Sequence, residues 1–171
     1  MIAGAGETLD TNGPNGPNGA SDADDAIVHE VVYPHPPRRV WRALTDSAAL
    51  ARWLMPNDFA PRVGHRFTFR VEPRHGRSSI VACEVVELDE PRRLAYTWAS
   101  DRGLPPTLVI FTLQAVDGGT LLRLEHTGFS AGGPGAASIR DLLDRGWDSL
   151  LRYEELPKLL DRWAGEDEPI P

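Results

Sequence analysis

Residues 120–129 read Thr-Leu-Leu-Arg-Leu-Glu-His-Thr-Gly-Phe, and Arg145-Gly146-Trp147 follows on a long amphipathic segment. In the first stretch Leu122, Leu124 and His126 share one face of a strand, because side chains alternate along an extended backbone. The tryptophan of the second stretch lies on the apolar stripe of a predicted helix. Together they are typical of a small antiparallel sheet closed by one C-terminal helix. A curved sheet wrapped around a helix encloses a cavity, and we expect the functional site to lie in that cavity.

Working outward, apolar and alternating patterns predict six strands with short connections. Asp117-Gly118-Gly119 is a hairpin signal between the last two. Short connections favour an antiparallel meander with one dry face. The third strand is apolar on both faces at its centre, so its inward side is not assigned. The predicted strands are 27–33, 65–72, 78–88, 93–99, 107–116 and 120–127, and two short helices are predicted at 38–44 and 48–54.

The period changes after residue 134, where apolar residues recur every three or four positions from Ile139 to Trp163. This spacing predicts one long amphipathic helix. Pro157 has no N–H to donate to the carbonyl of Tyr153, so we expect a kink there. The fold class is therefore α+β, with two short helices and one long C-terminal helix packed on a curved antiparallel sheet.

Composition divides the 171 residues into a domain and two end segments. Residues 1–26 are polar and rich in Gly and Asn, which predicts a disordered leader. Residues 27–163 form the predicted domain, and residues 164–171 an acidic tail. Of the 25 acidic residues, eight lie in the end segments, which leaves 17 in the domain against all 18 Lys and Arg. This near-neutral domain is not typical of a nucleic-acid-binding protein.

The remaining composition constrains location and cofactors. Cys83 is the only cysteine, which excludes an internal disulfide. No apolar run approaches the ~20 residues that span a bilayer, and the N-terminus lacks the features of a signal peptide. We therefore expect a cytoplasmic protein without membrane insertion. No two of the five histidines have metal-ligand spacing, so no metal or other cofactor is predicted. A homodimer is left open.

An ordered set of motifs resembles the START-like (Bet v 1-like) helix-grip superfamily, also called SRPBCC. The chain is most similar there to the domain related to the C-terminal half of the activator of the Hsp90 ATPase. The similarity covers about residues 27–163. It rests on Pro36-Pro37-Arg38-Arg39-Val40-Trp41-Arg42-Ala43-Leu44-Thr45-Asp46, Gly64-His65-Arg66-Phe67-Thr68-Phe69, Glu84-Val85-Val86-Glu87, the run from Pro91 to Trp98, Asp117-Gly118-Gly119-Thr120, His126-Thr127-Gly128-Phe129 and Gly146-Trp147.

The resemblance implies a cavity between the sheet and the C-terminal helix. Two departures matter. Family members often have a glycine soon after the second helix's tryptophan, whereas Trp53 is followed here by Leu54-Met55-Pro56. The co-chaperone also has a separate N-terminal domain that engages Hsp90, and residues 1–26 are too short and polar to replace it. Hsp90 activation is therefore not expected.

Two residues are candidates for acid–base chemistry. His126 points inward if Leu122 and Leu124 do, and a buried imidazole could move a proton. The alternative is a core histidine bonded to backbone or to a neighbouring hydroxyl. Glu84 would have a raised pKa if it faced the cavity, or would be a solvated sheet residue if it faced outward. His29 has the same ambiguity, and Cys83 is interpreted as a small core residue rather than a nucleophile.

The aromatic residues could line a ligand pocket or fill the core. As a set facing a kinked helix they suit a pocket for a small apolar or aromatic molecule with a few polar anchors. The predicted ligand-binding residues are Trp53, Phe67, Phe69, Tyr96, Trp98, Phe111, His126, Leu143, Trp147 and Leu151.

Three functions follow from this sequence. The first is binding of a small hydrophobic ligand without turnover, with His126 and Tyr96 orienting it. The second is an enzyme resembling the polyketide cyclases and aromatases, in which His126 or Glu84 would move protons. The third is a chaperone-interaction module of the Hsp90 type.

Overall fold

The computed structural model describes residues 25–71, 79–101 and 103–166. The predicted leader up to residue 24 and the tail from residue 167 lie outside these ranges. Within these ranges the chain forms six strands and four α-helices, which follow the predicted order except that two helices stand where one C-terminal helix was predicted. They are β1 (Ile27–Tyr33), α1 (Pro37–Thr45), α2 (Ser47–Trp53), β2 (Arg66–Val71), β3 (Ser79–Asp89), β4 (Arg93–Ser100), β5 (Thr107–Val116), β6 (Gly119–Thr127), the 3-10 helix η1 (Ser130–Gly135), α3 (Ala136–Arg152) and α4 (Glu155–Glu166).

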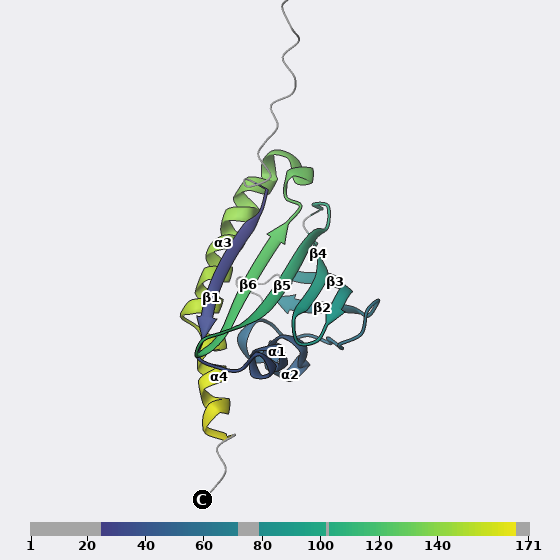
Figure 1. Cartoon of the computed structure of the whole chain (residues 1–171). Coiled ribbons are helices and arrows are strands. Elements are labelled where there is room, and N and C mark those ends of the chain that lie inside the picture. Colours follow the sequence, from purple (N-terminus) through teal and green to yellow (C-terminus); the bar gives the residue numbers. More distant parts are fainter. Residues whose placement is uncertain (1–24, 72–78, 102, 167–171) are drawn as a thin grey trace, which may run out of the picture.

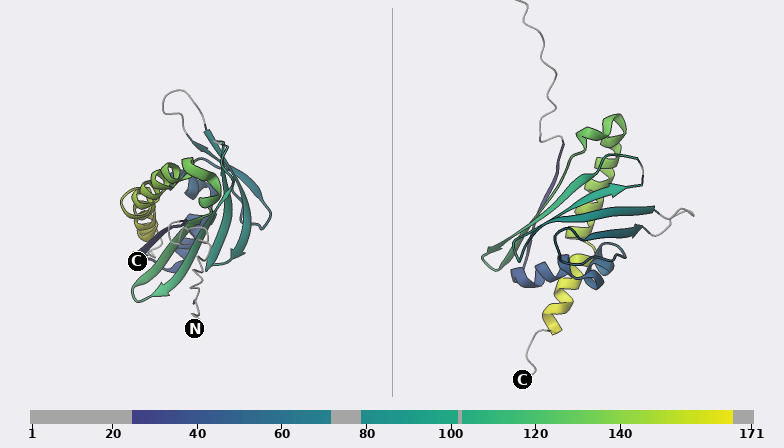
Figure 2. Two further views of the ribbon diagram at one scale, coloured as in Figure 1. Left: turned by 90° about the horizontal axis from the view of Figure 1, so that it is seen from above. Right: turned by 90° about the vertical axis from the view of Figure 1, so that its right-hand side faces the viewer.

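The six strands form one antiparallel sheet in the order β1-β6-β5-β4-β3-β2. The chain runs from β2 to β6 as a meander, and β1 joins the far side of β6. The sheet curves, and α3 lies across its concave side (Figures 1 and 2). The predicted α+β helix-grip fold is confirmed.

The two short helices follow local rules. Pro37 occupies the first turn of α1, where its missing N–H removes no hydrogen bond. Asp46 caps α2 by accepting a hydrogen bond from the Ala49 N–H at 2.8 Å. The indole of Trp53 donates to the Ala43 carbonyl at 2.8 Å and joins the two helices. Both lie at one end of the sheet (Figure 1).

The long C-terminal helix is interrupted rather than merely kinked. α3 ends at Arg152, and the N–H groups of Tyr153 and Glu154 both donate to the Ser149 carbonyl. α4 then begins at Glu155, so Pro157 lies in its first turn. The break occurs where the proline deprives the Tyr153 carbonyl of its donor. The expectation of one continuous helix is thus corrected to two helices.

The interruption lets the two helices pack against different parts of the molecule. α4 packs against α1, where the guanidinium of Arg42 lies 4.3 Å from the ring centroid of Trp163. His35 and Asp161 also join these segments, at 2.8 Å between Nε2 and Oδ1. α4 continues to Glu166, so the first residues of the predicted acidic tail are helical.

Polar bonds hold α3 against the edge strand β1. The Arg140 guanidinium donates to the Ala26 carbonyl at 3.1 Å, and Arg152 donates to the Glu30 carbonyl at 3.0 Å. The Tyr33 hydroxyl donates to the Leu151 carbonyl at 2.6 Å. These bonds fix the helix on the β1 side of the sheet, and an open space lies between α3 and the strands on the other side.

Candidate functional site

A pocket of about 270 Å³ lies between α3, one end of the sheet and the segment after α2. Among the described residues that line it, none carries a charged side chain. The lining residues are Leu54, Met55, Val71, Ser79, Val81, Trp98, Ser100, Leu104, Pro105, Thr107, Phe129, Ile139, Leu142, Leu143, Gly146, Trp147 and Leu150. Trp98, Leu143 and Trp147 of the predicted ligand-binding set are among them.

α3 contributes two parallel rows of side chains to the pocket. Ile139, Leu143 and Trp147 form one row at intervals of four residues, which places them on one face of a helix. Leu142, Gly146 and Leu150 form the second row. Leu142 is 52% exposed, and Gly146 is exposed as well, so this second row lies at the mouth.

Gly146 leaves the mouth wide. A Cβ added at this position would meet no other heavy atom within 4 Å. A glycine inside a helix lowers helix stability by roughly 0.5–1 kcal/mol relative to alanine. The sequence therefore retains a helix-weakening residue where a side chain would narrow the pocket.

The sheet supplies the floor and most of the polar groups. Val81 on β3 and Trp98 on β4 point inward beside Ser79 and Ser100, which occupy the ends of the same strands. Thr107 lies at the start of β5. The described lining thus forms an apolar space with three hydroxyl groups on its sheet side.

His126 lies behind this floor and is fully buried. Its Nδ1 accepts a hydrogen bond from the Trp147 indole N–H at 3.1 Å. Because indole nitrogen only donates, the ring proton of neutral His126 belongs on Nε2, which lies 2.7 Å from the Thr107 hydroxyl. That hydroxyl then donates to the Trp98 carbonyl at 3.2 Å.

Burial lowers the pKa of His126 to about 3, so the ring is neutral at neutral pH. Both of its nitrogens are occupied by protein groups. The structure therefore places His126 as a hydrogen-bonded link between α3 and the sheet, the arrangement of a core histidine.

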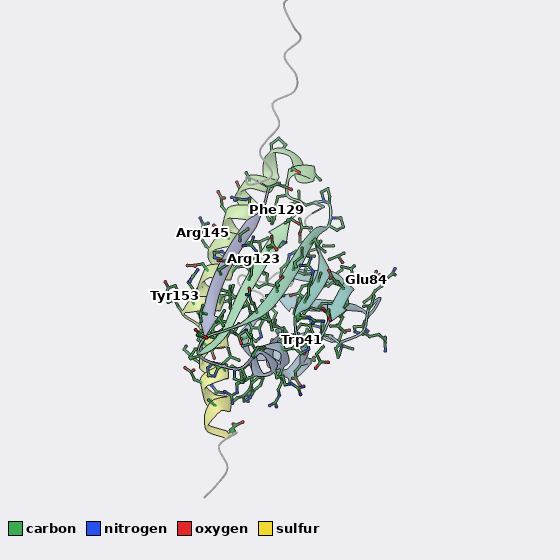
Figure 3. The ribbon with its side chains drawn as sticks, viewed as in Figure 1. Trp41, Glu84, Arg123, Phe129, Arg145 and Tyr153 are labelled. Carbon is green, nitrogen blue, oxygen red and sulfur yellow. The ribbon has the colours of Figure 1, made fainter. Side chains whose placement is uncertain are left out.

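The structure places Glu84 on the outer face of the sheet. Its carboxylate pairs with Arg66 at 3.1 Å and is 40% exposed. Figure 3 shows Glu84 at the margin of the molecule, on the side away from α3. Cys83, its neighbour, points inward, and burial raises the pKa of this thiol to about 12. Neither group lines the pocket.

His29 faces α3 rather than the pocket. Its Nε2 lies 2.8 Å from Asp144 Oδ1, and its Nδ1 lies 3.6 Å from Asp148 Oδ1. This contact joins β1 to α3. No group of three or more His, Cys, Asp or Glu side chains in the described ranges is arranged to hold a metal ion. No helix there is long and apolar enough to cross a membrane.

The other predicted ligand-binding residues pack inside the core. Phe67 contacts Phe69 and Tyr96 with ring centroids 5.3 Å and 5.4 Å apart, and Tyr96 contacts Phe111 at 6.1 Å. Trp53 and Leu151 are also fully buried. None of these six residues lines the pocket.

Sequence reasoning missed much of the lining. Ile139, Leu142 and Gly146 belong to the helical stripe or lie beside it, so the period of that segment was a usable signal. Leu54 and Met55 stand where the family often has glycine, and they form part of the wall. Leu104 and Pro105 come from a loop without a periodic pattern, and no sequence signal placed them.

Comparison with known proteins supports this architecture. The family described as "Activator of Hsp90 ATPase homolog 1-like protein" matches residues 34–161. The chain belongs to this family. No curated protein matches the chain.

Several solved structures are similar to the chain. Protein MLL2253 from Mesorhizobium loti is 36% identical with a TM-score of 0.70, and the match covers 80% of this chain and 97% of that one. Protein CV1439 from Chromobacterium violaceum is 26% identical with a TM-score of 0.65, covering 80% and 96%. CalU16 from Micromonospora echinospora shares the fold at 24% identity and a TM-score of 0.61, covering 79% and 74%. The resemblance inferred from the sequence motifs is confirmed.

Proposed function

We propose that this member of the family binds a small apolar molecule in the pocket between α3 and the sheet. The observation that carries the proposal is an open space of about 270 Å³ whose lining, in the described ranges, has no charged side chain. Pockets for small molecules are concave and mostly apolar, with a few polar groups. The helix-grip fold of the family is consistent with a ligand-binding domain.

The size of the pocket limits the ligand to roughly one or two fused rings or a comparable aliphatic body. Such a ligand buries about 250 Å² of apolar surface, which contributes about 6 kcal/mol at ~25 cal/mol per Å². Association entropy offsets part of this gain. A dissociation constant between about 50 μM and about 1 mM is therefore expected for a simple aromatic probe.

The lining favours binding over chemical turnover. Among the described lining residues, Ser79, Ser100 and Thr107 have polar side chains, and none of them is paired with a base that itself lines the pocket. His126 contacts Thr107 from behind, with both ring nitrogens already bonded. The two alternative functions, a cyclase-like enzyme and an Hsp90-type interaction module, stay predictions, because no contact among the described residues favours either.

Fluorescence titration with N-phenyl-1-naphthylamine, an uncharged probe that brightens in apolar surroundings, tests the proposal. The wild-type protein should saturate at one probe per chain. Gly146→Leu places a side chain in the mouth and should weaken binding at least tenfold. Gly165→Leu is the matched control, because Gly165 lies on α4, is exposed and is equally free of neighbours at its Cβ position.

The control variant should bind the probe as the wild type does. Two results would contradict the proposal: absence of saturable binding by the wild-type protein, or equal binding by Gly146→Leu and Gly165→Leu. Circular dichroism of both variants establishes that the helices are intact.

A further inference from the structure

The polar groups of the pocket are gathered on its sheet side and differ in what they still offer a ligand. Ser79 donates its hydroxyl hydrogen to Asp101 Oδ1 at 2.7 Å. A serine hydroxyl has one hydrogen, so Ser79 presents only lone pairs to a ligand. The hydroxyl of Ser100 makes no hydrogen bond to another described residue. These two residues form the polar end of the pocket.

Thr107 offers much less. Its hydroxyl donates to the Trp98 carbonyl and accepts from His126, as the tautomer fixed by Trp147 requires. The hydrogen of this hydroxyl is therefore already used. Ligand recognition through a hydrogen bond is left to Ser79 and Ser100, at the ends of β3 and β4.

The charged groups that the described residues place near this polar end disfavour an anionic ligand. The charged group bonded to the described lining residues is the carboxylate of Asp101, through Ser79. A ligand carboxylate or phosphate would face this negative charge without a cation among the described lining residues. Moving an ion from water into such a site is costly unless it is paired there. Asp101 is exposed, so water weakens its effect on a ligand charge of either sign, and the loss of hydration is the main cost for any ion in this pocket.

We infer that the pocket selects an uncharged ligand with an apolar body and one hydrogen-bond donor, of the phenol or alcohol class. The ligand hydroxyl donates its hydrogen to Ser79 Oγ and accepts the hydrogen of the Ser100 hydroxyl, and its apolar body lies between Trp98 and the Leu143–Trp147 face of α3. This inference rests on the proposed function and adds the chemical class of the ligand.

Three naphthalenes of similar size test it by isothermal titration calorimetry at pH 7. 2-Naphthol is uncharged and carries a donor, 2-methoxynaphthalene is uncharged and carries none, and 2-naphthoate is an anion. 2-Naphthol should bind best. The loss of one hydrogen bond should weaken 2-methoxynaphthalene about tenfold. The unpaired charge should weaken 2-naphthoate at least a hundredfold.

Substitution of the polar end locates the preference. Ser79→Ala should reduce the preference for 2-naphthol over 2-methoxynaphthalene from about tenfold to about threefold or less, without changing the affinity for 2-methoxynaphthalene, because only 2-naphthol donates to Ser79. Ser138→Ala is the matched control, because Ser138 is exposed on α3 and lies outside the pocket. The control variant should keep the wild-type preference.

The outcomes separate this inference from the proposed function. Equal binding of 2-naphthol and 2-methoxynaphthalene, or tighter binding of 2-naphthoate, overturns the inferred ligand class while leaving an apolar binding site. Failure of all three compounds to bind overturns the binding function and the ligand class together. An unchanged preference in Ser79→Ala overturns the assignment of the ligand's donor to this end of the pocket.

Discussion

The interior has two halves built from the same kinds of residue, one closed and one hollow. The closed half is the cluster Phe67, Phe69, Tyr96 and Phe111, in which every residue is at most 3% exposed. The hollow half is the pocket beneath α3. The segment after α2 seals the closed half, where Phe59 meets Phe67 at 5.1 Å between ring centroids. α3 is instead tied to β1, and the sheet beyond it is left partly uncovered.

The two halves meet at Trp98, and also where Phe111 lies 6.0 Å from Trp147 between ring centroids. The ring of Trp98 lies 5.7 Å from Phe69 on the closed side and 5.7 Å from Trp147 on the hollow side. Residue type therefore does not decide which aromatic side chains surround a space. The placement of the covering helix decides it, and that placement depends on Arg140, Arg152 and Tyr33 at the β1 edge.

The two halves should differ most in how much the free energy of unfolding falls when a side chain is truncated to alanine. Phe69→Ala removes a fully buried ring from close packing and should lower the free energy of unfolding by about 3–5 kcal/mol. Leu142→Ala removes a side chain that is already 52% exposed and should cost less than ~1 kcal/mol. Urea denaturation of both variants measures the difference. Similar losses in the two variants would show that the halves are packed alike.

Buried His126, which links α3 to the sheet, should make the free energy of unfolding depend on pH. Unfolded histidine has a pKa near 6.5, whereas burial lowers the pKa of folded His126 to about 3. Between these values the unfolded state binds more protons, so acid favours unfolding. Stability from this source is complete above about pH 6.5 and declines toward pH 3. The expected loss between pH 7 and pH 5 is about 2 kcal/mol.

Denaturation of the wild type and His126→Gln at pH 7 and pH 5 isolates this contribution, because the other titrating groups are common to both. The variant should be less stable at pH 7, since Trp147 and Thr107 lose their shared partner. It should also lose the ~2 kcal/mol dependence on pH. An equal pH dependence in the two proteins would contradict a buried neutral His126.

The fold could be read from the sequence more completely than the site. Alternation placed five of the six strands, a central apolar run between turn signals placed the third, and the motif order identified the family. Pro157 marked the right position for a disruption of the C-terminal helix. Whether this disruption would be a kink or a complete break depended on how α4 packs against α1 through Arg42 and Trp163. The sequence predicted Trp98, Trp147, Phe67 and Phe69 alike as ligand-binding residues. The two tryptophans line the pocket, whereas the two phenylalanines carry the same pattern and lie in the closed half. Sequence periodicity gives the inward face of a strand, and it does not reveal what covers that face.

Removing the hydroxyl group from each of two buried tyrosines should change the free energy of unfolding by smaller amounts and in opposite directions. Tyr33 donates its hydroxyl hydrogen to the Leu151 carbonyl, whereas the buried hydroxyl of Tyr96 in the closed half has no partner among the described residues. Burial raises the pKa of both, so both are protonated. Tyr33→Phe should lower the free energy of unfolding by about 1 kcal/mol, and Tyr96→Phe should raise it by about 1 kcal/mol. Thermal unfolding of the two variants measures the contrast, and a loss in Tyr96→Phe would reveal a partner for that hydroxyl.

The smallest effect tests whether the hollow half stays hollow in solution. Gly146→Ala adds a methyl group that would contact nothing within 4 Å, and alanine favours a helix over glycine. The variant should therefore gain about 0.5–1 kcal/mol of stability while keeping its affinity for the naphthylamine probe within about twofold. Gly165→Ala on α4 gives the gain expected from helix propensity without any pocket nearby. If α3 instead settles onto the sheet and closes the space, the added methyl group would clash there, and Gly146→Ala would lose stability while Gly165→Ala would not.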